Sequence, residues 1–375
     1  MGPFRLTLLS TAAVDRPGSM RRYAELVQEA LRTLPEGVRP VVTLVSLASP
    51  QPSFPALAGL SSRLANWLHH AVCAARVRGA TQRTHPDLVH VLDASHAYVV
   101  NALPRRLPVV ATVHDLIPLL TARGELPGPQ PSVGARCLWR LSLRGMARCR
   151  GLLADSDSTR RDLARLSCLD SGRIGVVGNA IGAPEVWRRA PTGEVHCPVP
   201  FIFHLGHNAA YKNREGVLRV AALVLRECPI RLVLAGPPPT AALRRLAAEL
   251  ALEAAIDWRC EVSDAELQAL YRSAAVFLFP SLYEGFGWPP LEAMACGCPV
   301  VCSNTASLPE VVGAAALLAG PADHAAMARH CLDLLTQPAV RAEWVRRGHE
   351  NTKRFTQERF ATELLDAYRR ARKTR

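Results

Sequence analysis

The segment FPSLYEGFGWPPLEAMACGCPVV, residues 279–301, passes from an apolar run through a glycine turn into a helical pattern and then into a second apolar run. Gly285 and Gly287 permit a tight turn and a close approach of the backbone to a ligand. Pro289 and Pro290 have the fixed φ angle that suits the first turn of a helix. Strand, turn, helix and strand in this order are typical of a parallel α/β sheet.

The segment also carries two carboxylates. Glu292 lies in the predicted first helical turn, where an acidic residue ordinarily caps the helix and complements its dipole. That explanation does not account for Glu284, which stands between bulky apolar residues beside a turn that exposes backbone amides. The helix start itself offers N–H groups and a positive dipole end, so it predicts an anion site suited to phosphate.

The same alternation of short β-branched runs and amphipathic runs extends outward in both directions and predicts parallel strands covered on both faces. The predicted strands are RLTLLS, VVTLVSL, DLVHVLD, LPVVATVH, GLLADS and RIGVVG, then PFIFHLG, IRLVLAG, AIDWRC, AAVFLFP and CPVVCS. Capping-box patterns at Ser263 to Glu266 and Ser307 to Glu310 predict two helix starts. Residues from about 322 to 372 have an all-helical pattern.

The alternation is interrupted once, by APEVWRRAPTGEVHCPVP, which carries four prolines and no apolar periodicity. The sequence therefore predicts an α/β chain with two Rossmann-like domains. We assign residues 1–182 to the N-terminal domain, 183–200 to the linker, 201–352 to the C-terminal domain and 353–375 to a C-terminal helix. A chain of 375 residues with 49% hydrophobic residues can bury two cores.

The composition limits the kinds of partner that the protein is expected to bind. The net charge of +13 suggests an acidic partner, which could be nucleic acid, an anionic membrane or a phosphorylated small molecule. Aromatic residues make up only 6%, which argues against nucleic acid. The basic end YRRARKTR fits a solvated helix terminus, or a surface for anionic lipid.

The cysteines and the hydropathy of the sequence indicate the cellular compartment in which the protein is expected. The eleven cysteines are mostly scattered and predict reduced thiols without disulfides. The first residues do not resemble a signal peptide, and no apolar run is long enough to span a membrane. We expect a soluble cytoplasmic chain, with membrane association on the cytoplasmic face as the lipid alternative.

In open parallel sheets, ligands bind beyond the carboxyl ends of the strands. Three places follow predicted strands and carry chemically useful residues: His114 with Asp115, the stretch from His207 to Lys212, and the turn of Glu284. These places would face one another if the two sheets met across a cleft.

The segment SLYEGFGWPPLEAMACGCPVV resembles the signature of retaining glycosyltransferases with two Rossmann-like domains, the GT-B architecture. That large family is typified by bacterial mannosyltransferases and sucrose-synthase-like enzymes. Further similar stretches cover most of the chain: TVHDLIPL, DSDSTRRDL, YKN, VSDAELQALYRSA and SNTASLPEVVGAAALL. The family topology implies that the C-terminal helix packs back on the N-terminal domain.

The resemblance implies roles for individual residues. Glu292 would bind the ribose hydroxyls of a nucleotide diphosphate sugar, and Glu284 would contact the donor sugar near its reacting carbon. Amides of Phe286 and Gly287 would hold sugar hydroxyls, while amides near Pro290 and Leu291 would hold the diphosphate.

The chemistry of the two carboxylates agrees with these roles. A carboxylate accepts hydrogen bonds from both hydroxyls of a cis-diol, whereas charge repulsion excludes phosphate as a partner of either glutamate. A carboxylate beside the reacting sugar stabilises the positive charge that develops as the diphosphate leaves. We expect Glu284 to act by such stabilisation rather than as a nucleophile.

Lys212 is the only lysine in the first 352 residues and is predicted to stabilise the leaving diphosphate. Similar enzymes pair this lysine with an arginine, and His207 and Tyr211 occupy the places where it would stand. Arg214 would point from a different helix face. Either His207 protonates beside the phosphates, or a residue of the other domain supplies the charge, or turnover is slow.

On the N-terminal side, the resemblance implies that His114 touches the donor sugar. GSMRRYAEL is similar to the family's acceptor-binding glycine loop, although Arg21 replaces an expected second glycine. We predict no metal: Asp155 and Asp157 stand where a helix begins and suit capping, and Cys296, Cys298 and Cys302 lack a fourth ligand.

The expected function is a retaining, metal-independent transfer of a hexose from a nucleotide diphosphate sugar, with GDP-mannose as the first donor to test. The acceptor would be a hydroxyl of a glycan or lipid-linked glycan, and no further cofactor is expected. A phosphorylase-like reaction would need a lysine-bound pyridoxal phosphate, for which no separate lysine is well placed. The other alternative is a catalytically weak family member that binds a nucleotide sugar or a partner protein.

Overall fold

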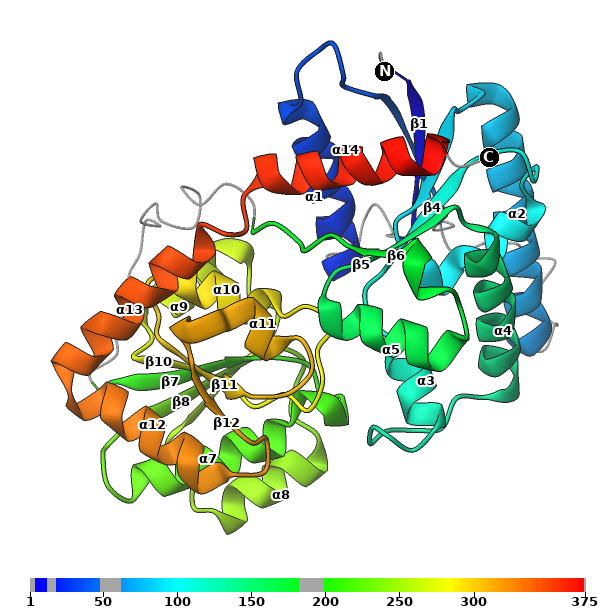
Figure 1. Ribbon diagram of the computed structural model, residues 1–375. Coiled ribbons are helices and arrows are strands. Elements are labelled where there is room, and N and C mark those ends of the chain that lie inside the picture. Colours follow the sequence, from blue (N-terminus) through cyan, green and yellow to red (C-terminus); the bar gives the residue numbers. More distant parts are fainter. Residues whose placement is uncertain (1–3, 12–17, 48–61, 182–198, 374–375) are drawn as a thin grey trace. The chain divides into compact units, whose positions relative to one another are not determined.

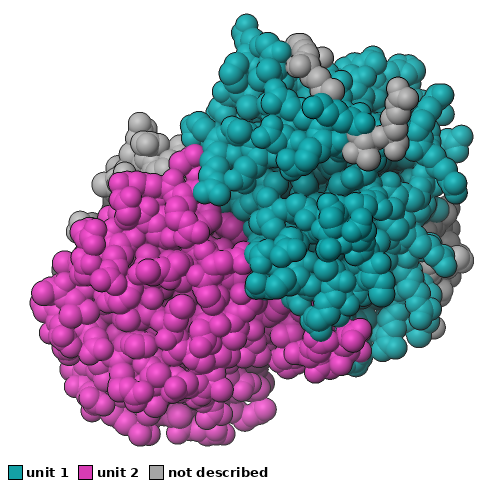
Figure 2. Space-filling model, in the orientation of Figure 1, with its two compact units in different colours: residues 1–119, 130–180, 357–375 teal, residues 120–129, 181–356 magenta. Residues whose placement is uncertain are grey.

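The computed structural model describes residues 4–11, 18–47, 62–181 and 199–373, and the chain divides into two compact units. Unit 1 consists of residues 1–119, 130–180 and 357–375, and unit 2 of residues 120–129 and 181–356 (Figure 2). Each unit is described by itself.

Unit 1 is built on a six-stranded parallel sheet in the order β2-β1-β3-β4-β5-β6. Its strands are β1 (Arg5–Ser10), β2 (Val41–Ser46), β3 (Leu88–Val91), β4 (Val109–Val113), β5 (Gly151–Ala154) and β6 (Ile174–Val176). The α-helices that begin in this unit are α1 (Ser19–Thr33), α2 (Ser62–Thr84), α3 (Ile117–Ala122), α4 (Val133–Arg148), α5 (Asp157–Ser167) and α14 (Gln357–Lys373). Short 3₁₀ helices lie at η2 (Ala94–Ala102) and η3 (Ser171–Arg173).

Unit 2 repeats the design with the strand order β12-β11-β10-β7-β8-β9, again all parallel. Its strands are β7 (Phe201–Leu205), β8 (Arg231–Ala235), β9 (Ile256–Arg259), β10 (Val276–Phe279), β11 (Val300–Ser303) and β12 (Leu317–Ala319). Its helices are α7 (Arg214–Leu225), α8 (Ala241–Glu249), α9 (Asp264–Ser273), α10 (Trp288–Ala295), α11 (Leu308–Val312), α12 (His324–Thr336) and α13 (Pro338–Thr352), with 3₁₀ turns η4 (Ala210–Lys212) and η5 (Gly313–Ala315).

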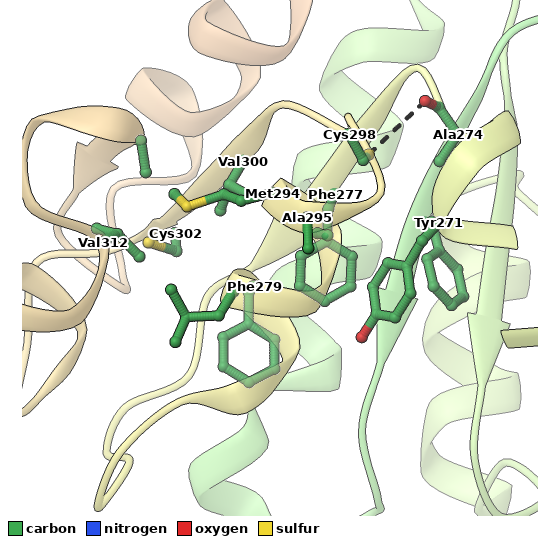
Figure 3. Packing of buried hydrophobic residues seen from close by; sticks show 14 of the residues in the cluster. Tyr271, Ala274, Phe277, Phe279, Met294, Ala295, Cys298, Val300, Cys302 and Val312 are labelled. Carbon is green, nitrogen blue, oxygen red and sulfur yellow. Dashed lines mark hydrogen bonds between the residues drawn. The ribbon is translucent and has the colours of Figure 1, made fainter. Parts of the chain in front are cut away.

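Strand β10 shows why this sequence forms a sheet that is buried on both faces. Phe277 and Phe279 pack into one apolar cluster with α10, whereas Val276 and Leu278 pack into a second cluster with α7 and α12. Successive side chains of a strand point to opposite faces, so an uninterrupted apolar run is suited to a strand covered by helices on both sides. Figure 3 shows part of the first cluster, where the Cys298 thiol donates to the carbonyl of Ala274.

All eleven predicted strands are present, and β12 is the one described strand that the sequence reading missed. It has three residues in the alanine-rich GAAALLAG, where neither β-branched residues nor a period of two identify a strand. The capping box at Ser263 and Glu266 is confirmed. The one at Ser307 is wrong, because its side chain caps no helix and donates to two carbonyl groups of another loop.

The unit boundaries lie near the predicted ones, after Ala180 and after Thr356. Most of the predicted linker lies outside the described residues. Residues 120–129, assigned above to the N-terminal domain, group instead with unit 2. Gly124, in a left-handed conformation (φ 75°), ends α3 within this segment.

The C-terminal helix α14 belongs to unit 1 and lies beside α1 (Figure 1). Its apolar stripe is buried: Phe360, Leu364, Leu365 and Tyr368 are at most 5% exposed. Tyr368 also reaches the sheet, since its hydroxyl lies 2.8 Å from Nδ1 of His90 on β3.

Candidate active site

The strand order of unit 2 reverses between β7 and β10. The chain runs from β7 to β8 on one side and from β10 to β11 on the other, so the loops that follow these two strands diverge. In open α/β sheets this reversal leaves a crevice at the carboxyl ends of the strands, where ligands bind. Lys212 comes from the loop after β7 and Glu284 from the loop after β10.

The structure brings these two predicted residues into one ion pair. Nζ of Lys212 lies 2.8 Å and 2.9 Å from the two carboxylate oxygens of Glu284. Their side chains are only 13% and 10% exposed. Nζ also lies 5.4 Å from the ring centroid of Phe279, within the range of a cation–π contact. The ammonium of Lys212 and the carboxylate of Glu284 therefore compensate each other's charge in a largely desolvated part of the site.

The loop after β10 is tied to the loop after β7 by further hydrogen bonds. Asn213 donates from its side chain to the carbonyl of Pro280 at 2.9 Å, and the amide of Leu282 donates to the carbonyl of Tyr211 at 2.7 Å. Asn213 has a left-handed backbone (φ 53°) and caps α7 through its side-chain oxygen. The residue after the lysine thus fixes both the start of α7 and the loop that carries Glu284.

Gly287 is the glycine of the turn that needs its conformational freedom. Its φ is +108°, and a Cβ atom there would lie 2.9 Å from the side chain of Leu308. Helix α10 begins at the next residue, Trp288. In α-helical geometry the amide of Leu291 then bonds back to Gly287, and proline has no N–H. Pro290 therefore offers no amide of its own, and the predicted diphosphate contacts near Pro290 and Leu291 stay a prediction.

Glu292 is the fifth residue of α10, beyond the first turn in which we placed it, so it does not cap the helix. It is 2% exposed, and one carboxylate oxygen accepts a hydrogen bond of 2.9 Å from the hydroxyl of Tyr271 on α9. Its role in binding ribose stays a prediction. Phe286, 6% exposed, contributes its ring to the core of unit 2, so only its backbone remains for the predicted sugar contact.

Similar enzymes pair the lysine with an arginine that this chain lacks, and the structure describes two residues, His207 and Arg214, that could replace its charge. Burial and the ammonium of Lys212 lower the pKa of His207, so protonated His207 is disfavoured in the protein without ligand. Arg214 is 4% exposed, lies over the ring of Trp258, and donates to Asn208 and to the carbonyl of Pro237. The guanidinium of Arg214 is therefore engaged by Asn208, Pro237 and Trp258.

In unit 1, His114 follows β4 and is held through both ring nitrogens. Nε2 donates to the carbonyl of Leu92 at 2.8 Å, and Nδ1 lies 3.5 Å from the carboxylate of Asp155. Burial lowers the pKa of His114, but the hydrogen bond and charge of Asp155, together with Asp93, outweigh burial and raise it. Among the described residues these contacts engage both nitrogens, and the predicted contact with a donor sugar stays untested.

The two aspartates near His114 have different contacts. Asp115 does not pair with His114; its carboxylate accepts from the amide of Ile117 at the start of α3. Burial raises the pKa of Asp115 to about 6. Asp155 is the partner of His114, and the sequence reading missed it. The strand-end rule that selected His114 also applies to Asp155, which directly follows β5.

The Asp155-Ser156-Asp157 tripeptide shows helix capping, with Ser156 as the capping residue. Asp157 pairs with Arg160 and Arg161, and Asp155 faces His114, so the two carboxylates do not converge. Within the described ranges, no group of three His, Cys, Asp or Glu side chains is placed to hold a metal ion. Burial raises the pKa of Cys298 and of Cys302, as expected for apolar thiols.

At the predicted acceptor loop, residues 12–17 lie outside the described residues. Gly18 directly precedes α1, and Arg21 forms an exposed ion pair of 2.8 Å with Glu25 of the same helix.

A buried chain of hydrogen bonds joins four elements of unit 1. Tyr23 of α1 bonds Thr112 of β4 at 2.9 Å, and Thr112 bonds His90 of β3 at 2.8 Å. His90 continues to Tyr368 of α14.

Two consecutive units, each with a six-stranded parallel sheet of this kind, are the GT-B type of architecture. Family models agree: "Glycosyl transferases group 1" matches residues 198–351, and "Glycosyltransferase Family 4" matches residues 29–183. The O-antigen chain mannosyltransferase B of Escherichia coli is 33% identical over 282 residues, covering 71% of this chain and 72% of that protein. This chain belongs to the group 1 glycosyltransferases.

Other relatives are similar over a smaller share of their length. The MMP alpha-(1->4)-mannosyltransferase of Mycolicibacterium hassiacum is 30% identical and is covered to 62%, with 67% of this chain matched. The serotype-specific mannosyltransferase WbdA of Escherichia coli is 31% identical over 61% of this chain, which spans only 30% of WbdA.

Solved structures share the fold. Sucrose-phosphate synthase from Thermosynechococcus elongatus superimposes with a TM-score of 0.77 at 19% identity, and the alignment covers 98% of each chain. Anabaena HepE in complex with UDP-glucose has a TM-score of 0.73 at 16% identity, covering 98% of this chain and 99% of HepE. In the part of the chain that the structure describes, no helix combines the length and apolar character needed to cross a membrane.

Proposed function

We propose that this glycosyltransferase moves a hexose, with mannose as the first candidate, from a nucleotide diphosphate sugar to a hydroxyl of a glycan or lipid-linked glycan. Configuration at the anomeric carbon is retained and no metal ion takes part. The observation that carries the proposal is the Lys212–Glu284 pair at the strand reversal of unit 2, beside the left-handed turn at Gly287. The mannosyltransferase relatives support the sugar, and the UDP-glucose complex of HepE supports the class of donor.

The charges of the pair suit the two ends of the breaking bond. The ammonium of Lys212 stabilises the negative charge that develops on the departing diphosphate, and the carboxylate of Glu284 stabilises the positive charge on the sugar ring. In the protein without donor the two groups neutralise each other, which limits the free energy lost by burying either charge. Glu292, oriented by Tyr271, accepts hydrogen bonds from the ribose hydroxyls.

The test combines binding with product analysis. Nucleoside diphosphates and their sugars are first screened by thermal shift, because a ligand that binds the native state raises the melting temperature. We expect GDP and GDP-mannose to stabilise the protein. With a glycan acceptor and GDP-mannose, NMR of the product should show the α-anomer of the donor retained, and EDTA should leave the rate unchanged.

Several results would contradict parts of the proposal. Stabilisation by UDP-glucose and not by GDP-mannose would change the donor, an inverted anomer would exclude retention, and inhibition by EDTA would exclude the metal-independent reaction. No stabilisation by any nucleotide sugar would leave the family assignment in place but refute this chemistry for the chain.

Membrane contact through the basic end of α14 is a second, separate part of the proposal. Arg372 lies over the ring of Phe4 and Arg369 pairs with Asp366, while Arg370 and Lys373 are exposed. We expect binding to vesicles that contain phosphatidylglycerol, weakening steeply with salt, because each basic residue near an anionic surface contributes about 1 kcal/mol. Cosedimentation measures this, and an Arg370→Glu/Lys373→Glu variant should bind less. Equal binding to neutral phosphatidylcholine vesicles would rule it out.

A further inference from the structure

The segment from Ser303 to Ser307 begins at the last residue of β11 and lies against the loop that carries Glu284. Three hydroxyl groups at alternate positions of this segment donate to backbone carbonyls of residues 281–286. Those of Ser303 and Thr305 donate to Ser281. That of Ser307 lies 2.9 Å from the carbonyl oxygen of Glu284 and 2.7 Å from that of Phe286. We call Ser303, Thr305 and Ser307 the hydroxyl row.

Of these three residues, Ser307 contacts the turn that carries Glu284 most directly. It is fully buried, and its hydroxyl is used for these two carbonyls although it stands at a helix start, where serine ordinarily caps. A hydroxyl has one proton to donate, so the two carbonyls share it. The function of the motif SNTASLPEVV in this chain therefore includes more than starting α11.

The direction of the two peptide groups gives the consequence. In a trans peptide the carbonyl of one residue and the N–H of the next point in opposite directions. Since the carbonyls of Glu284 and Phe286 point to Ser307, the N–H groups of Gly285 and Gly287 are turned away from it. We propose that Ser307 is a positioning residue, which fixes the backbone of the Glu284 turn and thereby holds the Glu284 carboxylate in place for the donor.

Two neighbouring observations support this role. Ala306 has a left-handed backbone (φ 50°), which is unfavourable for alanine and is the kind of local strain found at functional sites. Leu308, on the other side of Ser307, is the residue that a Cβ at Gly287 would strike. Residues 306–308 therefore pack closely against the turn at residues 284–287.

The inference rests on the proposed function for its kinetic consequence, but its structural consequence can be measured alone. Ser307→Ala removes the hydroxyl, and Ser142→Ala is the matched control, since Ser142 is fully buried and donates to the carbonyl of Ser95 at 2.6 Å in unit 1. Hydrogen exchange of amides in residues 281–294 should become faster in Ser307→Ala and stay unchanged in Ser142→Ala. This readout needs no substrate.

Kinetics with GDP-mannose separate positioning from general stability. We expect Ser307→Ala to lower kcat/KM by about ten- to a hundredfold, the effect of misplacing reacting groups, with the affinity for GDP changed less than about twofold. Ala306→Gly/Ser307→Ala relieves the left-handed alanine and should recover thermal stability without recovering the rate. Ser307→Thr keeps the hydroxyl and should retain more activity than Ser307→Ala.

The outcomes separate the role of Ser307 in the loop from the identity of the donor. Unchanged exchange at residues 281–294 in Ser307→Ala would overturn the positioning role, whatever the donor is. Full recovery of the rate in Ala306→Gly/Ser307→Ala would also overturn it, because only stability would then have mattered. Faster exchange in Ser307→Ala, with a wild-type protein that binds no nucleotide sugar, would support the role of Ser307 in the loop and refute the proposed donor.

Discussion

Glu284→Gln is expected to lower kcat by roughly a hundredfold or more, because a carboxylate that faces the reacting sugar acts mostly in the transition state. The affinity for GDP should change little. The structure adds a consequence for stability: Lys212 would lose the partner that it contacts at 2.8 Å and 2.9 Å. Breaking a buried ion pair by removing one partner costs about 3–5 kcal/mol. Steady-state kinetics and denaturant unfolding measure the two effects.

A double variant separates catalysis from stability. Lys212→Met/Glu284→Gln removes both charges and should recover most of the stability lost in Glu284→Gln, because no buried charge is left uncompensated. Its kcat should stay low. If activity returned together with stability, Glu284 would be a structural partner of Lys212 rather than a catalytic group.

Glu292→Gln is the variant to compare with Glu284→Gln, because Glu292 lies in α10, the helix that follows the Glu284 loop. We expect it to weaken GDP binding by about 1–3 kcal/mol, the cost of losing a hydrogen bond to a charged acceptor, and to act mainly through the donor KM. Tyr271→Phe, which removes the 2.9 Å hydrogen bond to Glu292, should weaken GDP binding in the same direction. Equal weakening of GDP binding by Glu284→Gln and Glu292→Gln would show that the two carboxylates are assigned wrongly.

Removal of residues 357–375 is expected to make the protein insoluble. Helix α14 buries Phe360, Leu364, Leu365 and Tyr368 against unit 1. At about 1.5–3 kcal/mol for each large apolar side chain, the loss is comparable to the roughly 5–15 kcal/mol that stabilises a whole domain. Solubility on expression and near-ultraviolet circular dichroism check the result, and a soluble, fully active truncation would contradict it.

Tyr368→Phe is the mild counterpart of the truncation. It keeps the apolar contacts and removes the hydroxyl that lies 2.8 Å from His90, so a buried ring nitrogen loses its partner at a cost of about 1–3 kcal/mol. Tyr98→Phe is a matched control, since it removes a tyrosine–histidine contact of 2.9 Å to His70 that is only part-buried. A loss no larger in Tyr368→Phe than in Tyr98→Phe would argue against a structural role for the buried chain.

Much of the fold could be predicted because local chemistry specifies it. Apolar runs such as VFLF at β10 have few alternatives to a strand covered on both faces, and Pro289 with Pro290 sets a helix start to within one or two residues. The strand-end rule selected His114, Lys212 and Glu284 for the same reason, since it needs only the order of elements.

The contacts of those residues were decided by the tertiary structure. Glu284 and Lys212 are 72 positions apart, and their pairing depends on β7 and β10 being neighbours, which the alternation of strands and helices does not fix. Ser307 matched a capping box in sequence, yet its hydroxyl turned to Glu284 and Phe286 because another loop brought two carbonyls within reach. His114 took Asp155 as its partner rather than the adjacent Asp115, since β5 follows β4 in the sheet.

The sequence by itself thus determined most of the elements, their order, the two parallel sheets and the family, because hydrophobic periodicity, turn residues and motif spacing act over a few neighbouring residues. The tertiary structure alone decided which polar groups meet, because a buried hydrogen bond or ion pair depends on the strand order and the register that bring distant loops together.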